Sequence, residues 1–389
     1  MKYDFDKITD RRNTSCLKYD FAAERGRDKD VLPLWVADMD FPAPPAVIKA
    51  LKKRADHGIF GYSRPKADYF YSVAKWFERR HGWSPDPSAF VVAPGVVFAI
   101  SALIRTVTKE GDGVLISEPV YYPFADTVRD NGRKLVVSEL ANKSGRYEVD
   151  YKDFEKKIIE NSVKAFILCS PHNPVGRVWT EEELMRMGDI CLKHNVFVIS
   201  DEIHADFTFA GYTHRVFATL KREYEKSCAV CTAPTKTFNL AGLHVSNIYI
   251  PNGEIRARYQ AELEKIGYTE PNVMGMAACV AAYEKGADWL DALKGYLAEN
   301  LAFLRTWLQE NLPEIKLIEP EGTYLVWLDC RALGLDDGAL QALVEKKAKL
   351  WLDDGYIFGK GGSGFERVNI ACPRATLKEA LNRLKAALR

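Results

Sequence analysis

Apolar runs of strand length alternate with stretches of helical periodicity between about residues 46 and 250. The strands are predicted at residues 114–117, 134–137, 165–169, 196–200, 228–232 and 244–250, and the helices at residues 45–57, 66–80, 96–108 and 181–194. This alternation is typical of repeated βα units around a mainly parallel, buried sheet. The sequence therefore predicts an α/β fold for this part of the chain.

A long helix predicted at residues 287–309 separates this pattern from a different one. Its leucines recur at three- and four-residue spacing, which indicates a stripe that faces the core. The following residues predict a shorter mixed unit, with strands at 315–318, 323–328 and 365–371 and helices at 338–347 and 377–388. We therefore predict a large domain over residues 46–286 and a smaller α/β domain formed by residues 287–389 together with residues 1–45.

The composition is that of an ordinary globular protein with a small-molecule partner. Of 389 residues, 54 are Lys or Arg and 53 are Asp or Glu, so the net charge of +1 provides no overall field to attract nucleic acid or a membrane surface. Residues 1–6 include three charged side chains where a signal peptide would need an apolar core, and no run approaches the roughly 20 apolar residues of a membrane span. We expect a cytoplasmic protein, whose eight scattered cysteines are reduced core thiols.

Two short motifs match cofactor or metal sites only by their letters. Residues 359–364 fit the dinucleotide pattern G-x-G-x-x-G, but that motif precedes a helix, whereas residues 365–370 alternate like a strand. Cys228 and Cys231 lie three apart in a predicted strand, where such residues point to opposite faces. We therefore expect neither nucleotide binding nor a metal site at these positions.

Four segments that each follow a predicted strand or open a helix carry the candidate chemistry. Asn173 lies between two prolines directly after one buried strand, and Asp201 ends the next, where it serves equally well as a simple helix cap. Lys236 follows a third strand within an uncharged stretch of small residues, a setting that lowers the pKa of an amine and makes it reactive towards carbonyls. Gly95 opens an apolar helix whose unpaired amides suit a phosphate.

A reactive lysine, a phosphate seat and a carboxylate that can pair with a pyridinium nitrogen are the groups that pyridoxal 5′-phosphate (PLP) requires. At this point the chain resembles the fold-type I PLP-dependent enzymes of the class I/II aminotransferase superfamily. The similarity is greatest to the cystathionine β-lyase and cysteine-S-conjugate β-lyase (C–S lyase) branch. Five segments in the right order carry the resemblance, at residues 33–41, 58–62, 201–204, 235–242 and 367–374.

The resemblance implies a set of cofactor-binding residues. Lys236 would bind the cofactor covalently and move the substrate Cα proton, Asp201 would keep the pyridine nitrogen protonated, and Tyr121 would stack on the ring. These three are the catalytic residues that it implies. The further cofactor contacts that it implies are Asn173 at the phenolic oxygen, the backbone amides of Gly95, Val96 and Val97 at the phosphate, and the neighbouring Thr235 and His204.

The resemblance also implies how substrate and subunits are held. Arg367 would bind the substrate α-carboxylate, a task suited to a planar bidentate donor, while Ala37 and Asp38 would line the substrate side. Tyr62 would reach the phosphate of the neighbouring subunit, which implies a homodimer with shared active sites. Arg374 is assigned to structure.

Two positions differ from many aminotransferases and favour elimination. His204 stands where a tyrosine is common, and His244 stands where a phosphate-binding arginine is common. The leading hypothesis is a PLP-dependent C–S β-lyase that converts cystathionine or another S-substituted cysteine into thiol, pyruvate and ammonia. The alternatives are a PLP-dependent aminotransferase and a PLP-binding regulatory protein with vestigial lyase activity. Which S-substituted cysteine is the substrate is left open.

Overall fold

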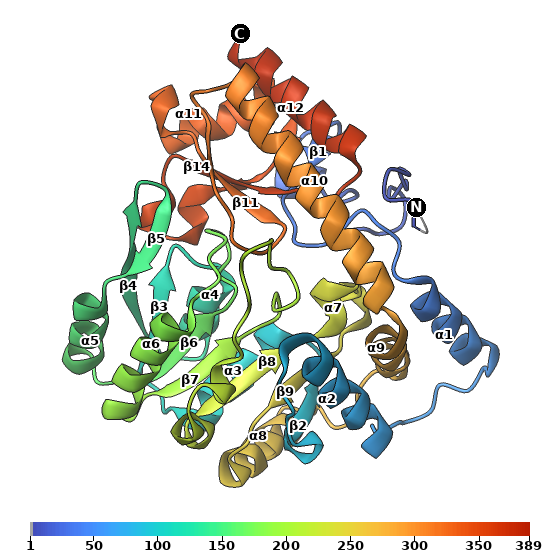
Figure 1. Ribbon diagram of the computed structural model, residues 1–389, viewed down its shortest axis with the longest axis vertical. Helices are drawn as coiled ribbons and strands as arrows, with labels where there is room; N and C mark the ends of the chain where they lie inside the picture. The colour runs from blue at the N-terminus through green and yellow to red at the C-terminus, as the bar shows by residue number, and fades with distance from the viewer. Residues whose placement is uncertain (1–2) are drawn as a thin grey trace.

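An eight-stranded sheet forms the centre of the larger unit in the computed structural model, which describes residues 3–389 (Figure 1). The strand order is β2 (Phe90–Ala93), β9 (Ser246–Tyr249), β8 (Cys228–Thr232), β7 (Phe197–Asp201), β6 (Val163–Cys169), β3 (Gly113–Glu118), β4 (Lys134–Lys143) and β5 (Arg146–Val149). The run from β8 to β4 is parallel, whereas β9 is antiparallel to both of its neighbours and β5 to β4. The predicted mainly parallel α/β sheet is confirmed.

Helices cover both faces of this sheet. One face packs against α3 (Val96–Val107), α4 (Pro123–Asp130) and α8 (Gly253–Lys265), and the other against α5 (Tyr151–Glu160) and α6 (Glu181–Lys193). Because side chains alternate along a strand, Cys228 and Cys231 of β8 belong to the cores on opposite faces. The prediction that these two cysteines are separated by the sheet is confirmed.

A smaller antiparallel sheet lies in the upper unit of Figure 1, in the order β10 (Lys316–Ile318), β11 (Leu325–Asp329), β14 (Phe365–Asn369) and β13 (Asp353–Asp354). The long α10 (Ala287–Asn311) packs against α12 (Arg374–Leu388) beside this sheet, and α11 (Asp337–Ala342) lies near the end of the unit.

The N-terminal segment attaches to this smaller unit. The short β1 (Leu32–Pro33) pairs in parallel with β12 (Leu350–Trp351). This pairing supports the division that we propose, with residues 46–286 as the large domain and residues 1–45 and 287–389 as the small domain.

Three helices complete the larger unit beside the sheet: α1 (Pro45–Asp56), α2 (Ala67–His81) and α9 (Val273–Lys285). The connection between α1 and α2 runs along the outside of the molecule and exposes apolar side chains at Ile59, Phe60 and Tyr62. Across residues 3–389, no helix combines the length and apolar character needed to cross a bilayer.

Candidate active site

The parallel strands β6, β7 and β8 bring three predicted site residues to one edge of the sheet. Asp201 is the last residue of β7, while Asn173 and Lys236 each lie four residues beyond the end of β6 and β8. Lys236 sits in the single-turn helix α7 (Pro234–Thr237), which lies between the large sheet and the smaller unit (Figure 1). Neighbouring parallel strands end at the same edge, so the order of the strands produces this grouping.

Burial shifts the two central ionisable groups in opposite directions. It lowers the pKa of the Lys236 amine to about 8 and raises the pKa of the Asp201 carboxyl to about 7. The Lys236 Nζ donates a hydrogen bond of 2.7 Å to the carbonyl oxygen of Ala37, and Asp201 Oδ1 accepts one of 3.1 Å from the Ile203 amide. The amine is therefore poised for chemistry near neutral pH.

Arg367 on β14 reaches the same edge from the smaller unit. Its side chain is only 3% exposed, and its Nη1 donates to Asn173 Oδ1 at 3.0 Å. Its Nη2 donates to the carbonyl oxygen of Trp35 at 2.6 Å and forms a close ion pair with Asp353. The Nε is buried and has no hydrogen-bond partner among the described residues. The structure thus joins Arg367 directly to Asn173, as expected for one site.

Sequence reasoning missed the residues that hold the extended segment of residues 35–41 across the site. Asn369 Nδ2 donates to the carbonyl oxygens of Val36 and Asp38, at 2.7 and 2.6 Å. The Tyr324 hydroxyl donates to the Ala37 oxygen at 3.1 Å, so this carbonyl accepts from both Tyr324 and Lys236.

Asn239, three residues after Lys236, holds the other end of this segment. Its Nδ2 donates to the carbonyl oxygens of Met39 and Phe41, at 2.9 and 2.8 Å, and its Oδ1 accepts from the Met39 amide at 3.0 Å. Asn239 and Asn369 lie within two of the segments that carry the family resemblance, at residues 235–242 and 367–374, which is the sequence signal that could have found them. Tyr324 lies in none of these segments, and its partner Ala37 is far away in the chain.

Asp38 lies within a cluster of four charges. Its carboxylate accepts two hydrogen bonds from Arg11, which also pairs with Asp40 at 2.8 Å. The fully buried Lys18 donates to Asp40 at 2.9 Å and lies 3.8 Å from Asp38. These contacts fix the segment that carries Ala37, so Asp38 is placed beside the site but with its charge already matched.

His204 and Tyr121 complete the polar lining. Burial, together with the positive charges of Lys236 and Arg367, lowers the pKa of His204 to about 3, so its imidazole is neutral. Its Nδ1 is buried with no hydrogen-bond partner among residues 3–389. Burial also raises the pKa of Tyr121, so its hydroxyl stays protonated. The backbone amide of Tyr121 donates to the backbone carbonyl oxygen of Asn173 at 3.0 Å.

The N-terminus of α3 faces open space at Gly95. A Cβ on Gly95 would meet no heavy atom within 4 Å, and the first amides of the helix, at Val96 and Val97, lack intrahelical acceptors. This end of the helix suits an anion such as phosphate. Thr235 is buried in α7 beside Lys236.

Three positions lie outside this cluster. Tyr62 is 96% exposed on the connection between α1 and α2, so within one chain it is not packed against the site. His244 is exposed and has a left-handed backbone with φ of 49°. Arg374 begins α12, where its Nε donates to Asn300 Oδ1 at 2.6 Å, in line with the structural assignment.

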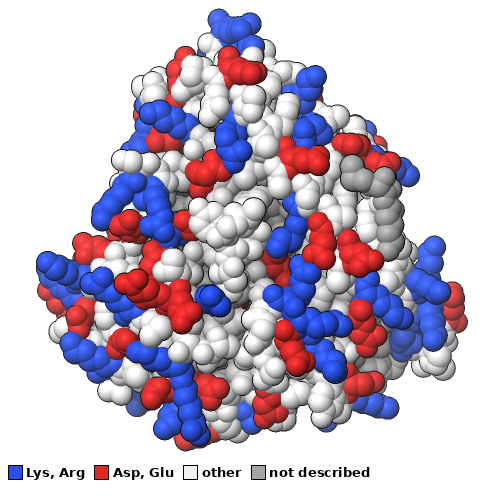
Figure 2. Space-filling view, viewed as in Figure 1, with Lys and Arg blue, Asp and Glu red and all other residues white. Residues whose placement is uncertain are grey.

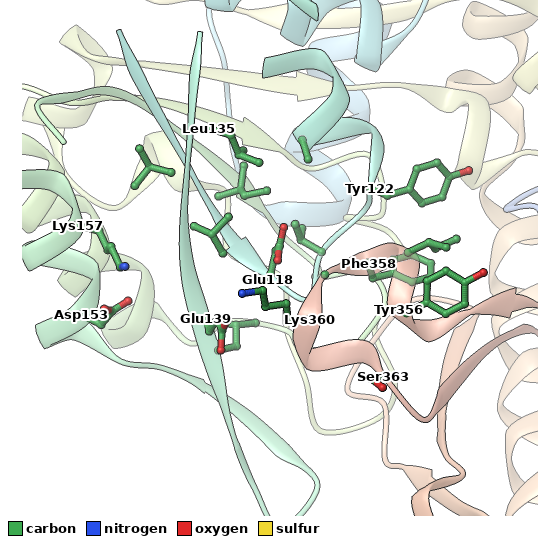
Figure 3. Close-up of a pocket in the computed structure, with 18 of the residues that line it drawn as sticks. Glu118, Tyr122, Leu135, Glu139, Asp153, Lys157, Tyr356, Phe358, Lys360 and Ser363 are labelled. Carbon is green, nitrogen blue, oxygen red and sulfur yellow. The ribbon is translucent and has the colours of Figure 1, made fainter. Parts of the chain in front are cut away.

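A cavity of about 1370 Å³ is lined by residues of β3, β4, α4 and α5 and of the loop before β14 (Figure 3). Its lining includes Glu118, Tyr122 and Phe358, but not Lys236 or Arg367. The rings of Tyr122 and Phe358 meet edge to face at 5.8 Å, and the guanidinium of Arg367 lies 4.9 Å from the Phe358 ring. Phe358 therefore lines this cavity and also contacts Arg367.

The glycine-rich loop of residues 359–364 borders this cavity and leads into β14, not into a helix. Its φ of +119° at Gly359 favours glycine, and a Cβ there would collide with the Glu118 carboxylate. The loop therefore lets two units pack closely, and the expectation that it lacks the dinucleotide-binding context is confirmed.

Comparison with known proteins places the chain among relatives of the same length. The model of the family "Aminotransferase class I and II" matches residues 29–384. Cystathionine beta-lyase PatB of Bacillus subtilis (strain 168) is 44% identical over 384 residues, which cover 99% of both chains.

Two solved structures show the same fold. Cystalysin from Treponema denticola, which contains a pyridoxal 5′-phosphate cofactor, is 40% identical with a TM-score of 0.96 over 100% of this chain and 99% of the other. The PLP-bound C-S lyase from Staphylococcus hominis is 33% identical with a TM-score of 0.93, over 99% of this chain and 98% of the other.

Proposed function

Because the chain belongs to the aminotransferase class I and II family, we propose that it is a PLP-dependent carbon–sulfur lyase that acts on cystathionine or another S-substituted cysteine. The observation that carries this proposal is the grouping of Lys236, Asp201 and Arg367 at one sheet edge, in a chain that matches lyases over its whole length. The products are thiol, pyruvate and ammonia.

The residues present fit PLP. The buried Asp201 carboxyl, with a pKa of about 7, suits a cationic N–H such as that of a protonated pyridine ring. The open space at Gly95 and the free amides of α3 suit the phosphate. The Nδ1 of the neutral His204 has no hydrogen-bond partner among the described residues, so it is available to a polar group of the cofactor. Lys236 has the lowered pKa that covalent attachment to an aldehyde requires.

PLP, when bound, supplies an electron sink that stabilises negative charge at the substrate Cα. We propose that the Lys236 amine removes the Cα proton, because its pKa of about 8 leaves a substantial neutral fraction near neutral pH. Asp201 holds the proton on the pyridine nitrogen, and Arg367 binds the substrate carboxylate through its guanidinium. Asn173, which is bonded to Arg367, would bind the phenolic oxygen of the cofactor and so connect it with the carboxylate site.

Elimination is favoured over transamination by two histidine positions. His204 is neutral and cannot supply the phenolic hydroxyl that a tyrosine would bring to this place. His244 stands where many aminotransferases have an arginine, and its side chain is exposed. A substrate with a β-thiolate leaving group can then lose it once negative charge develops at Cα.

We further propose that the protein acts as a cytoplasmic homodimer with shared active sites. Tyr62 and its apolar neighbours Ile59 and Phe60 are exposed on one connection, which suits contact with a second subunit. In such a dimer Tyr62 would reach the phosphate of the partner's site.

The test is product formation without an amino-group acceptor. Purified holoenzyme given L-cystathionine should release pyruvate, ammonia and free thiol in equal amounts, and the cofactor should keep its aldehyde-form absorbance. Turnover that depends on an added 2-oxo acid would contradict the lyase proposal and favour the aminotransferase. PLP binding without any turnover across a panel of S-substituted cysteines would favour the regulatory protein.

A further inference from the structure

Asp353 is a buried carboxylate that no part of the proposed reaction uses. It lies on β13, directly across from Arg367 of β14 in the antiparallel register, and its side chain is 7% exposed. It forms a close ion pair with Arg367 Nη2. A carboxylate therefore already occupies the guanidinium that is assigned to the substrate carboxylate.

The donors of Arg367 show where the two carboxylates compete. A carboxylate binds a guanidinium bidentately either through Nε and Nη2 or through Nη1 and Nη2, so both arrangements need Nη2. In this structure the two acceptors at Nη2 are the Trp35 carbonyl oxygen and Asp353 Oδ2. A bidentate substrate must displace one of them.

The two acceptors differ in how easily they can leave. The Trp35 carbonyl belongs to the segment of residues 35–41, whose next carbonyls are held by Asn369 and Tyr324. Asp353 contacts Nη2 through its side chain alone, so a change of rotamer withdraws it without moving the backbone. The buried Nε of Arg367 has no acceptor, which marks the edge where an incoming oxygen gains a hydrogen bond.

We propose that Asp353 is a displaceable counter-ion of Arg367, which occupies the carboxylate site until the substrate α-carboxylate replaces it. This inference rests on the proposed role of Arg367. Asp353 then sets the affinity of the site for carboxylates. In the free enzyme it keeps the buried guanidinium of Arg367 paired, and it weakens the binding of every substrate because each α-carboxylate must compete with it for Arg367.

The test measures binding of L-alanine, which has the α-carboxylate but no leaving group, to the holoenzyme by calorimetry. Asp353→Asn should bind L-alanine about tenfold more tightly than wild type, because a neutral amide competes less well than a carboxylate for a guanidinium. L-Alaninamide, which lacks the carboxylate, should bind both proteins equally. Asp353→Ser should bind L-alanine more tightly to the same degree, so the test still stands if one of the two variants fails to fold.

Asp354→Asn is the matched control. Asp354 is the next residue of β13, but it bonds to Gln341 and Tyr356 instead of Arg367, so its loss should leave L-alanine affinity unchanged. Unchanged or weaker binding in both Asp353 variants would overturn the inference and make Asp353 a fixed anchor of Arg367. Equal tightening for L-alaninamide would also overturn it.

A third arm separates this inference from the proposed function. Arg367→Leu should lose L-alanine binding by at least about a hundredfold if Arg367 receives the carboxylate. Wild-type affinity in Arg367→Leu would overturn the role of Arg367 itself. Loss of binding in Arg367→Leu without tightening in the Asp353 variants would overturn the role of Asp353 alone.

Discussion

Burial moves the pKa values of Lys236 and Asp201 towards each other, to about 8 and about 7. Removing either group from water disfavours its charged form, so the amine loses its proton more easily and the carboxyl keeps its proton longer. At neutral pH each group then exists in both states. A pKa near neutrality suits Lys236, which must form a covalent bond, and Asp201, which must hold a proton.

The pKa of Lys236 predicts how the apoenzyme takes up PLP. Only the neutral amine attacks the aldehyde, so the rate of cofactor attachment should rise with pH through about 8 and level off above it. An unshifted lysine would place this rise near about 10.4. Stopped-flow absorbance of the bound cofactor measures the profile. Lys236→Ala, which lacks the amine, should give no attachment, and a profile that still rises at pH 10 would contradict the lowered pKa.

Arg367→Leu should cripple catalysis while PLP stays bound. Loss of a bidentate contact to a buried carboxylate typically costs about 2–5 kcal/mol, which lowers kcat/KM by roughly two to three powers of ten. Steady-state kinetics and the cofactor spectrum measure the two effects separately. Arg374→Leu is the control, because Arg374 bonds to Asn300 on α10 and should change kcat/KM little. Near-normal kcat/KM in Arg367→Leu would move the carboxylate role elsewhere.

At the scale of elements, a buried ion network joins the larger unit to the smaller one. Arg177 follows β6 and is fully enclosed, with its Nε 2.8 Å from Glu321 between β10 and β11. Its Nη2 lies 2.7 Å from Glu183 of α6, and its Nη1 donates to the Tyr147 carbonyl. One guanidinium therefore connects three elements near the site that contains Asn173.

Arg177→Met should lower the free energy of unfolding by about 3–5 kcal/mol, because the buried Glu321 and the half-buried Glu183 lose their enclosed guanidinium and keep only the more exposed Arg146 nearby. Urea unfolding followed by tryptophan fluorescence measures the change. Arg305→Met is the matched control: Arg305 pairs with Glu319 at the surface, where an ion pair contributes at most about 1 kcal/mol. Equal losses in both variants would show that the Arg177 network does not carry this stability.

At the scale of the whole molecule, the net charge of +1 gives little overall attraction for a strongly charged partner. Figure 2 shows acidic and basic side chains interspersed over the viewed face, in keeping with the net charge of +1. The exposed apolar side chains at Ile59, Phe60 and Tyr62 are a more specific surface feature. They favour a second copy of the chain as the partner.

Mixing two inactive variants tests the shared site. Lys236→Ala and Tyr62→Phe subunits, once exchanged, form hybrid dimers in which one site carries both lesions and the other carries neither. Random pairing should therefore restore about a quarter of wild-type activity, because half of the dimers then have one intact site. Subunit exchange is confirmed with differently tagged chains, and no gain over either parent would place Tyr62 outside the partner's site.

The positions of most strands along the chain, and the residues that follow them, were predictable from the sequence because they depend on local pattern. Asn173, Asp201 and Lys236 each follow a buried apolar run, and parallel strands bring such positions together. Shorter elements escaped prediction. β1, β12 and β13, the strand that carries Asp353, have two residues each, so none of them shows a usable periodicity.

The sequence itself thus determined the family of this protein and, through reactive residues in recognisable local settings, the candidate chemistry of its site. The contacts that tune the site were decided only by the tertiary structure. Ala37 meets Lys236 and Tyr324, and Asp353 meets Arg367, through contacts between distant segments or through the register of a two-residue strand. Burial then set the pKa values, because desolvation depends on what packs around a side chain and not on its neighbours in the chain.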